Sequence, residues 1–315
     1  MSQVLQTSKH FQRPRGLAAA IYKNRAVYTL LLPGLIWYLV FAYGPMGGLS
    51  LAFKDYRANL GIWGSPWVGM QNYHYVFRDA AFWRSVWRTL FINLGRLIFE
   101  FPMPVILSLI LNELRMPRYK KVLQTIFTFP HFLSWVIVSS VMINFLSVEG
   151  LVNSIVKSLG GSAFNFLGNT TAFQPMLYIT SIWKSAGWSA IIYLAAISGI
   201  DMDQYEAAQI DGASRLQRIA HITLPNIMPT VTVMFILQTG SIMSAGFDQI
   251  FNLSNVAVRD VSETLDMYIY RITFQAPPDF GFSMAVSLFR SVINMALLVL
   301  ADRGAKLMGG SGLFA

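Results

Sequence analysis

Few residues in this 315-residue sequence could support catalysis or metal binding, and they are scattered. There is no cysteine, and the four histidines at positions 10, 74, 131 and 221 lack the spacing of a metal-binding helix. The phosphate-binding pattern G-x-x-x-x-G-K-[S/T] is absent, and GGSG at 309–312 lacks the lysine. We therefore expect no catalytic residue, no metal site and no ATP site in this chain.

A second group of candidates lies inside apolar stretches. A charged side chain at membrane depth costs a few kcal/mol or more, so each is a candidate for a transport pathway. Each also has a plainer explanation: an i, i+4 ion pair, a lysine extending to the interface, a residue at the end of a span, a helix–helix hydrogen bond, or an aromatic belt. The candidates for the substrate pathway are Arg96, Lys184, Trp183, Trp188, Gln238, Asp248 and Arg290.

The sign of the charges at depth suggests a substrate class. Three cations, Arg96, Lys184 and Arg290, outnumber the two acids, Glu100 and Asp248. Aromatic faces on the fourth apolar stretch could stack on sugar rings. An anionic substrate would suit such a pathway.

The elements that carry these residues must be membrane helices. The chain is 54% hydrophobic and 12% charged, about half the charge of a soluble domain. Its mean hydropathy is +0.48, and the net charge of +9 suits loop ends at an anionic lipid surface better than nucleic acid. The fold class expected is an all-α integral membrane protein.

Six stretches are long and apolar enough to span a bilayer as a helix, which takes about 20 residues. The first is too long for a signal peptide and no small-residue cleavage site follows it, so we expect it to be retained. The expected organisation is a basic segment 1–26, a six-helix domain 27–301 and a tail 302–315. The spans are expected at about 27–51, 89–111, 125–146, 175–197, 227–251 and 282–300.

Lysines and arginines predict the orientation. They are more numerous in the loops on the side of the N-terminus, and the short loop 115–121 holds four in seven residues. We expect both termini in the cytoplasm of a bacterium, with the chain passing several times through the inner (plasma) membrane.

The loop 201–230 is unlike the other loops. Asp201 and Asp203 can begin a helix, and Gly212 permits a sharp turn. Leu216, Ile219 and Ala220 form the apolar stripe of a second helix from about 213 to 221, which Pro225 and Pro229 are expected to end. The loop therefore predicts two short helices set at an angle on the cytoplasmic side.

The residues of this loop resemble the EAA loop of permeases in binding-protein-dependent, ATP-driven (ABC) importers. The stretches 31–56, 65–77 and 127–146 are similar to the carbohydrate branch of that family, which implies a sugar substrate. Together with the positive charges at depth, this resemblance leads us to expect an acidic oligosaccharide, such as an alginate-like uronate fragment. The resemblance implies type I importer architecture and a coupling helix that docks on a separate ATPase. The matching positions are Glu206, Ala207, Ala208, Asp211, Gly212, Ala213, Leu224 and Pro225.

The resemblance also implies the partners. ATP and magnesium would bind a separate ATPase dimer, a second permease would complete the pathway as a heterodimer, and an extracytoplasmic solute-binding protein would deliver the sugar. A stand-alone secondary transporter or channel is the alternative, and it would favour inverted repeats. An intramembrane enzyme would need a metal cluster or a nucleophile–base pair.

Overall fold

The computed structural model describes residues 21–114, 116–244, 246–275, 277–307 and 312–313. Within them, five helices are long and apolar enough to cross a membrane. A sixth stretch meets the same criterion when α10 (Thr170–Ser198) is taken together with the following α11 (Met202–Ile210), from which it is bent by 73°. The predicted all-α fold with six membrane helices is confirmed. Residues 1–20 of the predicted segment 1–26 lie outside the described residues.

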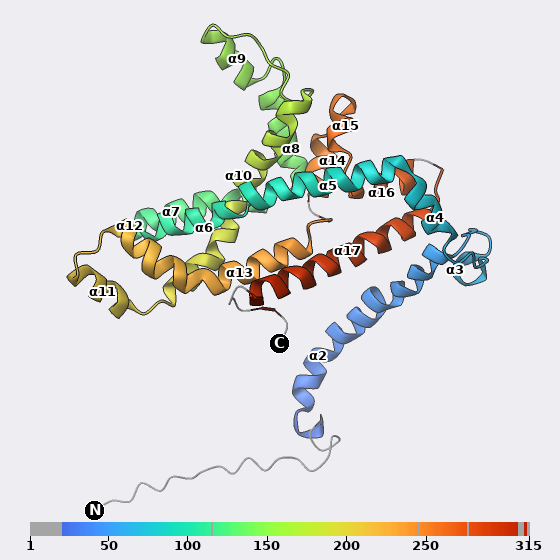
Figure 1. Ribbon diagram of the computed structural model, residues 1–315, viewed down its shortest axis with the longest axis horizontal. Coiled ribbons are helices and arrows are strands. Elements are labelled where there is room, and N and C mark those ends of the chain that lie inside the picture. Colours follow the sequence, from blue (N-terminus) through green and yellow to red (C-terminus); the bar gives the residue numbers. More distant parts are fainter. Residues whose placement is uncertain (1–20, 115, 245, 276, 308–311, 314–315) are drawn as a thin grey trace, which may run out of the picture.

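The first span lies apart from the rest of the chain (Figure 1). It consists of α2 (Arg25–Tyr38), a π-helical turn η1 (Leu39–Tyr43) and a 3₁₀ segment η2 (Gly44–Phe53). No residue of α2 or η1 is buried. Within the described residues of this span, the end of η2 is the anchored part: it packs on α17 (Phe280–Leu307) and α4 (Gln71–Arg78). Asn72 of α4 donates hydrogen bonds to the carbonyls of Ala52 and Lys54.

The second and third spans are each interrupted near their middle. A turn at Glu100 and Phe101 separates α5 (Ala80–Phe99) from α6 (Pro102–Asn112). The third stretch that is long and apolar enough to cross a membrane is Trp135–Ser158, in which a short turn separates α8 (Trp135–Leu146) from α9 (Leu151–Ser158), so the predicted third span, 125–146, is placed too early. A further break, at η3 (Phe129–Phe132), separates α8 from α7 (Pro117–Thr128). Proline cannot donate the backbone hydrogen bond that would continue a helix, so Pro102 and Pro130 begin new segments at these breaks.

Helix α10 (Thr170–Ser198) is the central element and packs against α6, α7 and α13 (Leu224–Gly240). Its close approach to α7 depends on Gly187, because a Cβ atom there would collide with the backbone carbonyl of Phe127. Small residues let membrane helices approach closely, which maximises van der Waals contact in the absence of a hydrophobic driving force.

The predicted end of the fifth span is wrong. Helix α13 (Leu224–Gly240) stops at Gly240, and Gly246, with φ of +91°, turns the chain into a short helix, α14 (Phe247–Leu253). The chain continues through η5 (Val256–Val258), α15 (Arg259–Ser262), α16 (Leu265–Tyr270) and η6 (Arg271–Gln275). Helix α17 (Phe280–Leu307) then forms the sixth span and extends six residues into the predicted tail.

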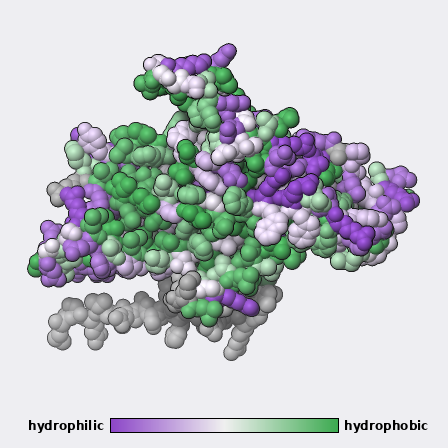
Figure 2. All heavy atoms as spheres, turned by 45° about the horizontal axis from the view of Figure 1, so that its top comes forward, coloured by the Kyte–Doolittle hydropathy of each residue, from purple (hydrophilic) through white to green (hydrophobic). Residues whose placement is uncertain are grey.

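The surface agrees with a membrane environment. Hydrophobic side chains cover the middle of the molecule, and hydrophilic ones gather toward its extremities (Figure 2). One apolar core joins α5, α16 and α17 around Phe82, Tyr268 and Val286. Another joins α5, α10 and α14 around Ile92, Leu177 and Ile250. Most of the remaining apolar surface faces outward, as expected where lipid is the solvent.

Candidate functional site

The loop 201–230 forms a helical hairpin at one end of the molecule (Figure 1). Asp201 caps α11 (Met202–Ile210) by accepting a hydrogen bond from the amide of Asp203. Gly212 has φ of +75°, a conformation that costs most other residues about 1–2 kcal/mol. Ser214 and Gln217 then form a reciprocal capping box at the start of α12 (Arg215–Arg218). The predicted helix–turn–helix is therefore present.

The second helix of the hairpin does not end at the prolines. Helix α12 continues through η4 (Ile219–Thr223) into α13, with Pro225 in the first turn of α13 and Pro229 inside it. Pro225 lies just after the π-helical turn η4, where the regular i→i−4 hydrogen-bond ladder is already interrupted, so a proline is tolerated there. The hairpin is thus a direct extension of the fifth span, and the prediction that these prolines end the helix is wrong.

Helix α11 is braced against this continuous helix. The hydroxyls of Tyr205 and Thr223 share a hydrogen bond of 2.9 Å, and Asn226 donates to the side-chain oxygen of Gln204 at 3.0 Å. A displacement of α11 is therefore transmitted to α13 by side-chain contacts as well as by the chain.

The outward face of the hairpin carries no contact from the described part of the chain that would bury it. Met202, Ile210 and Leu216 are 64%, 87% and 78% exposed, although all are apolar. Of the predicted coupling residues, Ala208, Ala213 and Leu224 are partly buried. The exposed ones are Glu206, Ala207, Asp211, Gly212 and Pro225.

A buried polar network crosses the middle of the bundle. Arg96 of α5 donates a 2.6 Å hydrogen bond to the side-chain oxygen of Gln249 on α14, and its Nε lies 3.7 Å from a carboxylate oxygen of Glu100. Gln249 in turn donates to the carbonyl of Leu177 and the hydroxyl of Thr180 on α10. Buried charges require such partners, so the network fixes α14 against two spans.

The other predicted cations also have partners within the chain. Lys184 is buried and donates to the carbonyl of His131, at the break between η3 and α8, while it lies 5.5 Å from the ring centre of Trp135. Arg290 forms an ion pair with Asp266 of α16. Lys184 is therefore not a lysine that extends to the interface: it satisfies a carbonyl that the helix break frees.

The remaining predicted pathway residues are dispersed. Asp248 is exposed in the first turn of α14. Trp183 and Trp188 are 45% and 44% exposed, and Trp188 stacks on His131 with ring centres 4.6 Å apart. Only Gln238 lies on the cavity described next. The structure does not bring the seven candidates together.

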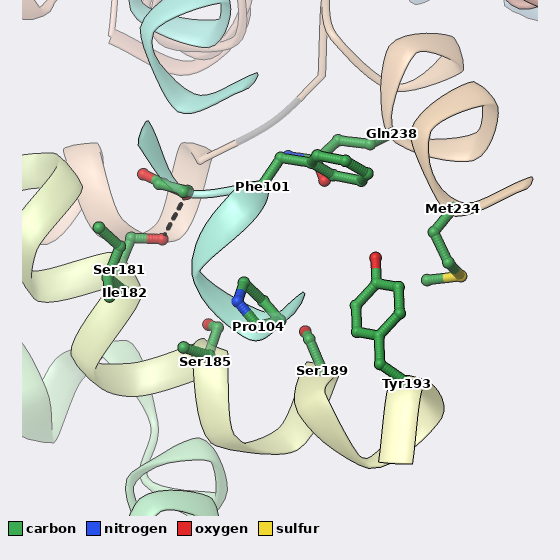
Figure 3. Close-up of a pocket in the computed structure, with 11 residues that line it drawn as sticks. Phe101, Pro104, Ser181, Ile182, Ser185, Ser189, Tyr193, Met234 and Gln238 are labelled. Atoms are coloured by element: carbon green, nitrogen blue, oxygen red, sulfur yellow. Dashed lines mark hydrogen bonds between the residues drawn. The ribbon is translucent and has the colours of Figure 1, made fainter. Parts of the chain in front are cut away.

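A polar cavity of about 180 Å³ lies where α6, α10 and α13 meet (Figure 3). Ser181, Ser185, Ser189 and Tyr193 line it from one face of α10, at successive intervals of four residues. Gln238 and Met234 line it from α13. Glu100 lies at its wall, accepting a 2.8 Å hydrogen bond from Ser181, while its second oxygen is buried without a hydrogen bond from the described residues.

The chemistry of this cavity is that of hydroxyl recognition. Serine and tyrosine hydroxyls donate and accept, and the glutamine amide does both. The residues that line it include one carboxylate and no lysine or arginine, so the predicted positive lining does not hold for this cavity. The serine stripe was visible as an i, i+4 pattern in the sequence, but the pairing of Glu100 with Ser181 was not, because 81 residues separate them.

Comparison with known proteins decides the family. Residues 104–303 match the model of the binding-protein-dependent transport system inner membrane component. The chain belongs to this family. It is 41% identical over 94% of its length to Protein LplB of Bacillus subtilis, 93% of which is covered. It is 40% identical over 96% of its length to the polygalacturonan/rhamnogalacturonan transport system permease YteP of the same species, with 94% of that protein covered.

Solved structures agree with this membership. The chain superimposes on a chain of a bacterial ABC transporter involved in the import of the acidic polysaccharide alginate, with a TM-score of 0.85 and 35% identity, covering 93% of this chain and 99% of that one. The match is similar for the alginate transporter in complex with its alginate pentasaccharide-bound periplasmic protein (TM-score 0.86, 35% identity, 94% and 99% covered). The predicted permease family, its carbohydrate branch and its type I fold are confirmed.

Proposed function

We propose that this chain is one half of the membrane pathway of an ATP-driven importer for acidic oligosaccharides. In this proposal the hairpin 201–230 faces the cytoplasm and docks on a separate ATPase dimer, which binds ATP and magnesium. A second, different permease completes the pathway in the bacterial inner membrane, and an extracytoplasmic binding protein delivers the substrate.

The observation that carries the coupling role is the exposed, braced hairpin. An apolar, uncovered face on a helix that is continuous with a membrane span suits a site where a partner subunit docks. Closure of an ATPase dimer on α11 would move α13 as a lever, because Tyr205 and Gln204 tie α11 to it. Glu206, exposed beside this face, is the residue we assign to the ATPase contact.

The substrate class is supported by the relatives and by the cavity. The similar proteins are named for polygalacturonan and for the acidic polysaccharide alginate. The hydroxyl-lined cavity at α6, α10 and α13 suits sugar hydroxyls. It accounts for the sugar but not for an acidic group, since its charged wall residue is Glu100.

Reconstitution tests the proposal. The complete importer in liposomes should take up trigalacturonate only with ATP inside, and Glu206→Ala should reduce uptake at least about tenfold with loss of ATPase co-purification. Glu149→Ala changes an equally exposed glutamate at the far end of α8 and serves as the control. Uptake that persists without the ATPase would refute the coupling role, and a strict preference for maltotriose would refute the acidic substrate.

A further inference from the structure

A second pocket, formed by residues that do not line the first cavity, contains two arginines. It has a volume of about 260 Å³, near the lower end of the range for small-molecule sites. It is built by the chain between α14 and η6. Its lining is Ser254, Asn255, Val256, Arg259, Ser262, Glu263, Met267, Tyr270, Arg271 and Gln275.

We propose that Arg259 and Arg271 bind the carboxylate of a uronic acid residue in this pocket as an acidic oligosaccharide enters the permease. The proposal rests on the proposed function, and it names the site that distinguishes acidic from neutral substrates. Arginine is suited to this role because its planar guanidinium can donate two parallel hydrogen bonds to one carboxylate.

The charges of the pocket favour an anion. Two guanidinium groups face one carboxylate, that of Glu263, so the ionisable Arg and Glu side chains that line it sum to a positive charge. Arg271 Nε donates to Glu263 at 2.6 Å, which orients this guanidinium. Arg259 lies 3.8 Å from the same carboxylate, beyond hydrogen-bond length, and its side chain is 58% exposed. Its donors are therefore available to a ligand.

The rest of the pocket suits a sugar ring. Tyr270 lies in an aromatic group with Phe247, Phe251 and Phe274, with ring centres 4.9–5.8 Å from its own, which holds its ring in place. Gln275 and Ser262 add polar groups. Aromatic faces next to amides and hydroxyls provide both the apolar and the polar contacts that a sugar offers.

The pocket is linked to the middle of the bundle by α14. Ser254 lies at one end of this helix, and Gln249, which accepts from Arg96, lies five residues earlier, roughly 8 Å along the helix axis. Because Arg96 also lies 3.7 Å from Glu100 on the hydroxyl-lined cavity, α14, one hydrogen bond and one ion pair connect the two sites.

Direct binding to the complete transporter, purified without its binding protein, tests the proposal. The probes are trigalacturonate and its fully methyl-esterified form, which keeps the rings but loses the charge, measured by saturation-transfer NMR. The wild type should prefer the acid, and Arg259→Gln with Arg271→Gln should weaken acid binding about tenfold. Lys157→Gln, an exposed cation on α9, is the matched control and should change nothing.

A variant that is expected to bind the acid more tightly distinguishes loss of the site from misfolding of the protein. Glu263→Gln removes the competing charge while its amide oxygen can still accept from Arg271, so acid binding should tighten about threefold. An unchanged acid preference in the double arginine variant would overturn the site while leaving the importer function intact. Weakened affinity for the binding protein with unchanged probe binding would also overturn it, since the arginines would then bind an acidic side chain of that partner.

Discussion

The guanidinium of Arg96 lies 2.6 Å from the side-chain oxygen of Gln249, which joins the second span to the short helix α14 across 153 residues of sequence. Gln249 is fully buried and also donates two hydrogen bonds to α10. The uncharged side chain of Gln249 thus accepts a hydrogen bond from a buried cation on α5 and also ties α14 to α10, a span distant from α14 in the sequence.

Replacing Gln249 should destabilise the protein. Gln249→Leu removes the hydrogen bond that Arg96 donates, which leaves the guanidinium its 3.7 Å contact to Glu100. The substitution also removes the two hydrogen bonds from Gln249 to α10. The loss of a hydrogen bond to a charged group costs about 2 kcal/mol, which corresponds to a decrease of about 5 °C in Tm. Thermal unfolding in detergent measures this. Gln124→Leu, a partly exposed glutamine on α7, is the control, and equal Tm values for the two variants would contradict the role of the network.

The contact between α7 and α10 should not tolerate a methyl group. Gly187→Ala forces a Cβ atom against the carbonyl of Phe127, so the helices must separate, at a cost of about 1–3 kcal/mol. Gly34→Ala makes the same change inside α2, where nothing lies within 4 Å. We expect a lower Tm for Gly187→Ala and an unchanged Tm for Gly34→Ala. A stable Gly187→Ala protein would show that the spans pack less closely than described.

The orientation of the chain can be read with single cysteines, because the sequence contains none. Ile210 on α11 and Leu159 after α9 are 87% and 82% exposed. A membrane-impermeant maleimide should label Leu159→Cys in intact cells, and Ile210→Cys only after the inner membrane is opened. The unmodified chain should stay unlabelled. The opposite pattern would place the hairpin outside the cytoplasm and remove it from any contact with an ATPase.

The serine stripe should contribute to substrate affinity. Ser189→Ala removes a cavity hydroxyl, and a lost neutral hydrogen bond costs about 1 kcal/mol, so the half-saturation concentration for uptake should rise about fivefold. Ser198→Ala, more than one turn beyond the cavity residue Tyr193 on α10, removes a hydroxyl that bonds to its own helix and should have no effect. Equal affinities for both variants would show that substrate does not contact this cavity.

Local patterns account for what the sequence predicts well. The spans follow from runs of apolar residues, and the hairpin follows from Asp201, Gly212 and the polarity of the loop. The capping box of Ser214 and Gln217 was not predicted, although S-x-x-Q before an apolar stripe is its sequence signature. These features depend on residues within a few positions of one another, so hydropathy and capping rules suffice.

What could not be predicted depends on distant residues. The end of the fifth span was placed at 251 because 241–251 is apolar enough, whereas the chain breaks at Gly240 and uses Gln249 to hold Arg96. Arg259 and Arg271 were counted only as loop charges, because nothing local shows that they share a pocket. The partner of Arg290, Asp266, lay outside the predicted spans.

The isolation of α2 has a consequence for how the protein is made. Because none of its residues is buried by the described part of this chain, the helix presents its whole surface to lipid or to a partner subunit and does not depend on packing against the spans synthesised after it. The earliest membrane insertion can be completed while the remaining spans are still on the ribosome. Assembly of the bundle then starts at Leu51 and Ala52, where the chain first meets a surface that buries it.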